Sequence, residues 1–148
     1  MQIKIQKEKE ISDFELGFIV GIYEGEGWFG LRKNRWQNKN QLKFNAMVYA
    51  RVEVSSTDRD VIEKIKEVLG IENIDTFQPR DKYGKYYKPV WKLGLNSNSA
   101  IELANLLYPY LSKRRQWQIE KMKIFHKSLL EDYEILKKLE KSATEPKN

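Results

Sequence analysis

The stretch IVGIYEGEGWF, from Ile19 to Phe29, decides how the rest of this chain is interpreted. It continues an apolar segment that opens with Ser12 and, three residues later, Glu15. That pair is typical of a capping box, so the sequence predicts a helix over residues 12–26. Apolar residues lie nearly all round this helix, and we therefore expect it to be buried.

Three glycines, Gly17, Gly21 and Gly25, recur at intervals of four in the predicted helix. This spacing places all three on one helix face. Each internal glycine costs about 0.8–1 kcal/mol relative to alanine. Close approach of a second backbone is the usual gain that offsets such a cost, so we expect this face to meet another helix.

Two carboxylates, Glu24 and Glu26, fall in the last turn of the same helix, where the helix dipole disfavours negative charge. One interpretation is that both simply point into solvent at the helix end. The other is a magnesium-type site, because hard cations bind carboxylate and carbonyl oxygens. One chain would make a poor cage, whereas two copies meeting across the glycine face would make a better one and supply a second metal by symmetry.

The composition narrows the function classes. The chain has 148 residues, no Cys and a single His, His126, which excludes disulfide scaffolds, cysteine zinc sites and His-rich metal sites. No apolar run is long enough for a membrane span, and the N-terminus lacks a signal-peptide core, so we expect an intracellular protein that is not secreted and has no membrane partner.

Lys and Arg number 27 against 21 acids, for a net charge of +6. Basic residues concentrate at 27–57 and 112–128, which favours a polyanionic partner.

Periodicity and turn residues predict the remaining elements. Strict alternation over residues 41–55 is typical of a strand with one buried face. Pro89 argues that the strand containing it lies at a sheet edge or bulge. The third helix has Asn98 or Ser99 as its expected cap. In all, we expect strands at 28–36, 41–55, 73–81 and 86–95, and further helices at 57–70, 97–111 and 112–141.

This order, αββαββα, predicts an α+β fold with a four-stranded antiparallel sheet, helices on one face and the other face free. We expect a single domain over residues 1–141, with a core at about 12–127 and a helical extension at 128–141. A disordered tail is expected at 142–148.

The exposed face of the sheet carries side chains of the kinds that contact phosphates and base edges. Every one-sided sheet has a polar face, so the pattern alone leaves simple solvation and nucleic-acid binding both open. The candidate contacts are Arg32, Asn34, Trp36, Lys43, Asn45, Tyr49, Arg51, Gln78, Arg80, Lys88 and Lys92.

With these pieces in place, residues 19–29 resemble the LAGLIDADG motif of homing endonucleases. In this register Gly21 and Gly27 match the motif glycines, and Glu24 and Glu26 match its two aspartates. The order of elements over about residues 12–125 is also similar to that family, as is the basic segment LLYPYLSKRRQWQIEKMKI. Glu in place of Asp, Tyr23 in place of a small aliphatic residue and Trp28 in place of Ser depart from the usual pattern.

The resemblance implies a saddle-shaped sheet that binds double-stranded DNA and a homodimer formed through the motif helix. It implies that Glu26 ligates divalent metal, with help from the Gly25 carbonyl. The expected ion is Mg²⁺, with Mn²⁺ or Ca²⁺ able to substitute for binding. The expected dimer interface comprises Gly17, Gly21, Ile22, Glu24 and Gly25.

The resemblance also implies two further active-site positions, each with a neighbouring alternative. Arg114, or its neighbour Lys113, would supply positive charge in the pocket, and Ser56, or Ser55, would order the water network. The implied activity is metal-dependent cleavage of both strands at a long pseudo-palindromic site in genomic or organellar DNA. Two alternatives share this fold: a DNA-binding protein that does not cut, and an intron RNA maturase.

Overall fold

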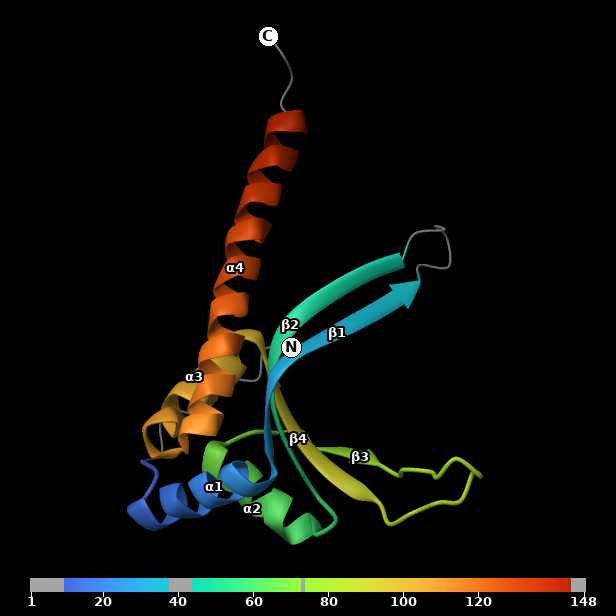
Figure 1. Ribbon diagram of the computed structural model, residues 1–148, viewed down its shortest axis with the longest axis vertical. Coiled ribbons are helices and arrows are strands. Elements are labelled where there is room, and N and C mark those ends of the chain that lie inside the picture. Colours follow the sequence, from blue (N-terminus) through green and yellow to red (C-terminus); the bar gives the residue numbers. More distant parts are fainter. Residues whose placement is uncertain (1–9, 38–43, 73, 145–148) are drawn as a thin grey trace.

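The computed structural model describes residues 10–37, 44–72 and 74–144, and its description leaves out the side chains of residues 34–37, 44–47, 136, 140, 143 and 144. Helices and pairs of strands follow one another along the chain in the order that the sequence predicts (Figure 1). The helices are α1 (Asp13–Glu26), α2 (Arg59–Leu69), α3 (Ser97–Leu107) and α4 (Lys113–Thr144), with a 3₁₀ turn η1 (Tyr108–Tyr110) after α3. The strands are β1 (Gly27–Gln37), β2 (Phe44–Ser56), β3 (Asp75–Phe77) and β4 (Val90–Asn96).

The four strands form one antiparallel sheet in the order β1-β2-β4-β3. Of the two alternatives that Pro89 suggested, an edge strand or a bulge, the edge is wrong, because β4 lies between β2 and β3. Pro89 precedes the first residue of β4, Val90, so its missing N–H never falls within the ladder. The edge strand next to β4 is the short β3, which covers only part of the expected strand 73–81.

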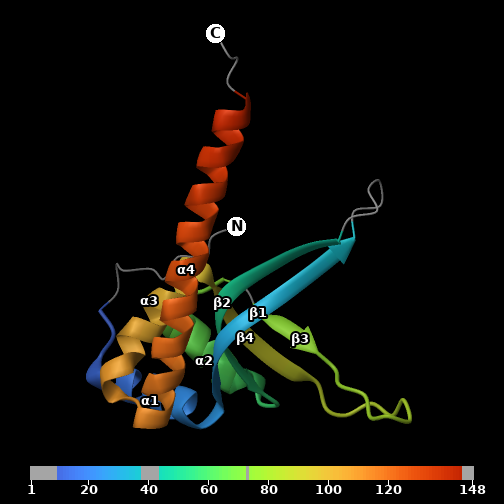
Figure 2. The same cartoon turned by 45° about the horizontal axis from the view of Figure 1, so that its top comes forward.

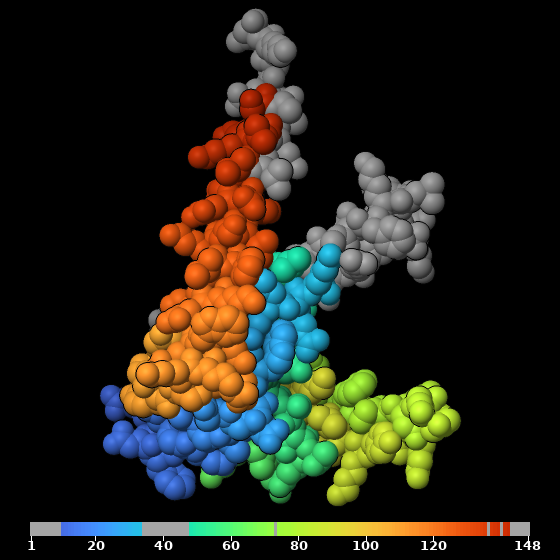
Figure 3. Space-filling model, in the orientation of Figure 1, coloured from blue at the N-terminus to red at the C-terminus, as the bar shows by residue number. Residues whose placement is uncertain are grey.

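All the helices pack on one side of the sheet, as predicted (Figures 1 and 2). The alternation in β2 is confirmed where side chains are described, because Ala50, Val52 and Val54 are buried beneath the helices. On the other side, the β1–β2 and β3–β4 pairs spread apart (Figure 1), and Figure 3 shows β3 and the segment that follows it extending away from the helices. The largest fully buried side chains are Ile19, Tyr23, Ile62, Ile65, Leu69, Ile71, Leu93, Leu95, Leu103, Leu107, Ile119 and Met122.

Helix α1 is only partly covered by its own chain, so within the single chain it is not buried as the sequence predicts. Ile19 and Tyr23 pack into the core, whereas Phe14 is 76% exposed. The expected capping box is present, with the Ser12 hydroxyl accepting from the Glu15 N–H and the Glu15 carboxylate accepting from the Ser12 N–H. The apolar residues that the sequence places round the whole helix therefore leave one side open on the single chain.

The other helix ends follow local chemistry. Asp58 caps α2 by accepting from the Asp60 N–H, and Gly70 ends it in the left-handed conformation with φ 66°. Helix α3 begins at Ser97 with Asn96 as its cap residue, so the expected cap at Asn98 or Ser99 is wrong. The Asn98 carboxamide instead contacts the ring of His126 on α4.

Helix α4 runs unbroken from Lys113 to Thr144, three residues beyond the expected boundary at 141. Its second half projects away from the other elements in both ribbon views (Figures 1 and 2). No helix in the described ranges is both long and apolar enough to cross a membrane.

Candidate nucleic-acid interface and catalytic centre

The acidic end of α1 lies at the surface. Glu26 is the last residue of the helix, and both Gly25 and Glu26 are exposed. Gly27 begins β1 and donates its N–H to the Tyr23 carbonyl. The last turn of α1 contains no basic residue, so its own sequence supplies no cation to its negative dipole end.

The missing cation comes from the start of α4. Arg115 is buried, and its Nε and Nη2 atoms donate to the Glu24 carbonyl oxygen at 3.1 and 3.0 Å. In the other direction, the Ser112 N–H at the start of α4 donates to a Glu24 carboxylate oxygen at 3.3 Å. Each helix end therefore receives from the other the charge that its dipole favours.

This arrangement holds the Glu24 carboxyl in its ionised form. The Ser112 hydroxyl lowers the pKa of Glu24 by hydrogen bonding, against the opposing cost of desolvation. The Ser112 N–H and the charges of Arg115 and Arg114 lower this pKa further. Glu24 therefore ties α1 to α4.

The predicted basic residues of the catalytic centre lie next to this contact. Lys113 and Arg114 occupy the first two positions of α4, and both are exposed. Ser56 ends β2 and is half-buried, and its hydroxyl accepts from the Asp58 N–H at 3.0 Å. A hydroxyl that accepts this bond also carries an O–H donor, which suits the expected water-ordering role.

On the sheet face, the structure brings together three of the predicted contacts, one from each of β1, β2 and β4. Arg32, Arg51 and Lys92 all form ion pairs with Glu53, at 3.2, 2.7 and 3.5 Å. Burial of Glu53 opposes its ionisation, but the Arg51 hydrogen bond and the three positive charges outweigh that cost and lower its pKa.

Of the other predicted contacts, Tyr49 borders this group of ion pairs, whereas those of the segment between β3 and β4 make contacts of their own. Tyr49 is half-buried and stands opposite Arg32 in the β1–β2 register. Gln78 donates to the Tyr87 carbonyl, and Arg80 bonds the Tyr86 hydroxyl, so both stabilise the chain between β3 and β4. Lys88, in the same segment, is exposed, whereas Lys43 and the side chains of Asn34, Trp36 and Asn45 lie outside the described part of the chain.

Two functional candidates were missed by sequence reasoning, Glu53 and Arg115. Glu53 is the one acid between residues 27 and 57, and it lies at a polar-face position of an alternating strand. Arg115 precedes Ile119 by four residues and Met122 by seven, which places it on the buried face of α4 rather than with its basic neighbours. Both signals are present in the sequence.

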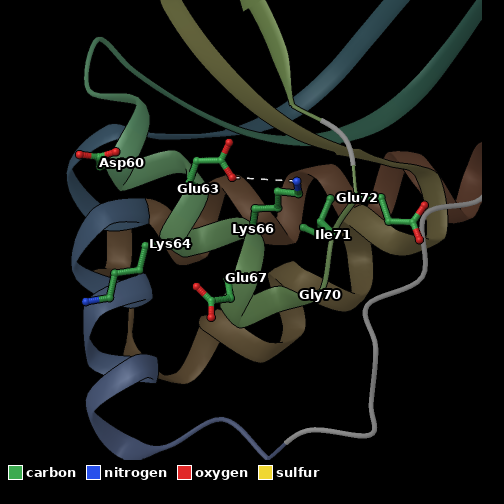
Figure 4. A pocket seen from close by; sticks show the side chains of 8 residues that line it. All are labelled: Asp60, Glu63, Lys64, Lys66, Glu67, Gly70, Ile71 and Glu72. Carbon is green, nitrogen blue, oxygen red and sulfur yellow. Dashed lines mark ion pairs between the residues drawn. The ribbon is translucent and has the colours of Figure 1, made fainter.

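A separate surface pocket lies on α2 and the residues that follow it (Figure 4). It contains no predicted site residue. Its lining mixes acidic and basic side chains, with Glu63 and Lys66 paired at 3.9 Å. The lining residues are Asp60, Glu63, Lys64, Lys66, Glu67, Gly70, Ile71 and Glu72.

Comparison with known families then decides the assignment. The profile of a family described as LAGLIDADG endonuclease matches residues 19–131, which is more than half of the chain. The chain belongs to the LAGLIDADG endonuclease family. No curated protein sequence shows significant similarity to the chain.

Solved structures of LAGLIDADG homing endonucleases and related homing endonucleases share this fold. The archaeal intron-encoded I-Vdi141I, complexed with DNA, is 24% identical, with a TM-score of 0.53 over 80% of this chain and 70% of that chain. The group I intron-encoded I-CeuI, also complexed with DNA, is 14% identical, with a TM-score of 0.59 over 85% and 60%. The LAGLIDADG meganuclease I-AabMI, bound to uncleaved DNA, is 22% identical, with a TM-score of 0.54 over 82% and 38%.

At these identities the likeness establishes the fold: an α+β domain with a four-stranded antiparallel sheet and helices on one face. The chain spans less than two thirds of I-CeuI and less than half of I-AabMI.

Proposed function

We propose that this LAGLIDADG chain acts as a homodimeric endonuclease that cuts both strands of a DNA duplex at a specific pseudo-palindromic site. The observation that carries the proposal is the placement of Glu24 and Glu26. One carboxylate is bound internally, to the start of α4, and the other lies exposed at the end of the same helix. Family membership and the DNA-bound structures of the same fold support it.

The glycine face of α1 supports a dimer through the motif helix. A Cβ atom placed on Gly17, Gly21 or Gly25 would meet nothing within 4 Å. Each glycine lowers the stability of the helix by about 0.5–1 kcal/mol relative to alanine. Within one chain, no described neighbouring element packs closely against the three glycines to offset that cost. A second copy of α1 lying against this face would provide such packing, with Ile22 and Glu24 at the same interface.

The exposed end of α1 suits a divalent metal ion. The Glu26 carboxylate and the Gly25 carbonyl are hard oxygen donors, the kind that Mg²⁺ prefers and that Mn²⁺ and Ca²⁺ also accept. Within the described ranges a single chain holds no group of three His, Cys, Asp or Glu residues able to bind a metal. Two copies meeting at the glycine face would pool their donors. A bound ion would activate water and stabilise the charge that develops on the phosphate.

The chain's own residues would then bind and orient the duplex. Lys113 and Arg114 lie at the start of α4, beside Glu24, where they can place positive charge near the scissile phosphate. Ser56 would orient water through its hydroxyl. The basic sheet face would bind the DNA backbone and read base edges, with Asn34, Trp36, Asn45 and Tyr49 on the β1–β2 pair and Gln78, Arg80 and Lys88 after β3 in the chain. Lys43, which lies outside the described residues, is proposed as a further contact. The substrate would be genomic or organellar DNA inside the cell.

The test is cleavage of a randomised duplex DNA library by the purified protein, with Mg²⁺ and with EDTA. Double-strand cuts that need Mg²⁺ and share one pseudo-palindromic sequence are expected. Selective DNA binding without cuts in Mg²⁺ or Mn²⁺ would contradict the nuclease and leave a DNA-binding protein. Preference for a folded intron RNA over duplex DNA in direct competition would instead favour a maturase.

A further inference from the structure

Among the sheet residues whose side chains the structure describes, Glu53 is the one buried carboxylate. Glu53 is 7% exposed, although it lies on the polar face of β2. Its Oε2 atom accepts from Arg51 Nε at 2.7 Å and from Arg32 Nη2 at 3.2 Å. Its Oε1 atom lies 3.5 Å from Lys92 Nζ. We call Glu53, Arg32, Arg51 and Lys92 the Glu53 cluster.

Each cation of the Glu53 cluster has a second partner besides the carboxylate. Arg51 Nη1 donates to the Asn96 carboxamide oxygen at 2.8 Å. The Arg32 guanidinium lies 4.8 Å from the centre of the Trp28 ring, and Lys92 Nζ lies 5.0 Å from that of Phe77. Long basic side chains lose up to about 2 kcal/mol of rotamer entropy when they are fixed. Because these contacts already hold the three basic side chains in place, much of their rotamer entropy is lost during folding and not on DNA binding.

Gly94 provides the space for Arg51. It stands opposite Glu53 in the β2–β4 register. A Cβ atom on Gly94 would lie 2.2 Å from Arg51 Nη2 and 2.4 Å from its Cζ, so the guanidinium lies directly over this glycine. The three nearest atoms all belong to the end of the Arg51 side chain. An alanine here would therefore displace the guanidinium without pressing on the backbone.

The charge balance of the cluster suits a polyanion. Three cations share one carboxylate, so the cluster keeps a net positive charge. Mobile lysines and arginines attract any DNA sequence through its phosphates. Arginine forks of fixed orientation discriminate between bases, because their donors match only certain base edges.

We infer that Glu53 is a positioning residue that fixes Arg32, Arg51 and Lys92 so that this part of the sheet reads base sequence instead of binding any DNA. The inference rests on the proposed function, since it takes duplex DNA as the ligand. Loss of Glu53 would release three cations and remove one negative charge. Binding to arbitrary DNA would then strengthen while discrimination weakens.

The experiment is binding selection from a randomised duplex DNA library in Ca²⁺, using the full chain and three variants. For E53Q we expect discrimination between selected and arbitrary duplexes to fall about 10–100-fold, and the salt dependence of arbitrary-duplex binding to steepen by about one in log–log slope. For G94A we expect discrimination to fall with the slope unchanged, because Arg51 moves but no charge is lost. E67Q removes the same charge from the α2 pocket and should match the wild type.

The outcomes separate this inference from the proposed function. If E53Q and G94A, both folded by circular dichroism, select the same sequences as E67Q with equal stringency, Glu53 is only a structural residue. If E53Q does not fold, the G94A result decides alone. If the wild-type protein enriches no sequence at all, the proposed function itself fails and this inference with it.

Discussion

Arg115 and Glu24, 91 positions apart in the sequence, join the C-terminal end of α1 to the N-terminal end of α4. The guanidinium donates twice to the Glu24 carbonyl, while the Glu24 carboxylate accepts from the Ser112 N–H. Helix ends expose backbone groups without intrahelical partners, and here each end satisfies the other. The contact fixes the helix end that carries Glu26, two residues after Glu24.

Arg115→Met should lower both stability and cleavage. It removes two charge-assisted hydrogen bonds to the Glu24 carbonyl oxygen and a third to the Gln118 carboxamide oxygen. Because Arg115 is buried, we expect the free energy of unfolding to fall by about 2–3 kcal/mol. Urea denaturation measures this change. Cleavage should slow as well, because the end of α1 is no longer held.

Arg114→Met is the matched control for the stability effect of Arg115→Met. Arg114 is exposed, so stability should change by less than about 0.5 kcal/mol. Cleavage should nevertheless fall about 100-fold if its charge serves the reaction. Equal stability losses for the two variants would contradict the assignment of Arg115 to the helix–helix contact.

Glu26→Gln should abolish cleavage and preserve DNA binding, because an amide keeps the size of the side chain but is a far weaker ligand for a hard cation. Cleavage in Mg²⁺ and binding by electrophoretic mobility shift measure the two effects. Glu67→Gln, on the α2 pocket, controls for the lost charge. Normal cutting by Glu26→Gln would show that the metal is bound elsewhere.

Gly21→Leu should convert the protein to monomers. Nothing lies within 4 Å of a Cβ at this position, so the single chain has room for the new side chain. Leucine is also favoured over glycine in a helix by up to about 1 kcal/mol. Between two closely packed α1 helices there would be no room for leucine, so the substitution should prevent dimer formation.

Light scattering during size-exclusion chromatography measures the mass in solution. Glu67→Leu, an exposed α2 position outside the glycine face, is the control and should keep the wild-type mass. An unchanged mass for Gly21→Leu would remove this face from the interface.

The Glu53 ion pairs should make stability depend on pH in a defined direction. The pKa of Glu53 is lowered in the folded protein despite the opposing effect of burial. A lowered carboxyl pKa stabilises the fold above the unfolded value, about 4.3, and this contribution is lost as pH falls through the lower folded value.

The measurement is the free energy of unfolding of wild type and Glu53→Gln between about pH 3 and pH 7. The difference between them should be constant above about pH 5 and shrink below about pH 4.3. Glu67→Gln, which removes the same charge from the α2 pocket, is measured under the same conditions as the control. A difference between wild type and Glu53→Gln that grows toward acid pH would contradict the assignment.

The sequence predicted most of the fold because its signals are local. The Ser12–Glu15 capping box, Asp58 and Gly70 set helix ends through hydrogen bonds or dihedral angles within a few residues. The alternation in β2 predicted which side is buried. One error arose where a local rule needed the neighbouring strand: Pro89 suggested an edge, but only the strand order showed that β4 is interior.

The sequence by itself determined the family, the order of elements and the acidic motif of Glu24 and Glu26, because each depends on residue types at fixed short spacings. Only the tertiary structure decided which charges meet. Glu53 contacts cations from three strands, and Arg115 reaches Glu24 across 91 positions. Strand register and helix docking create such contacts between residues far apart in the chain, and no local pattern encodes their distance.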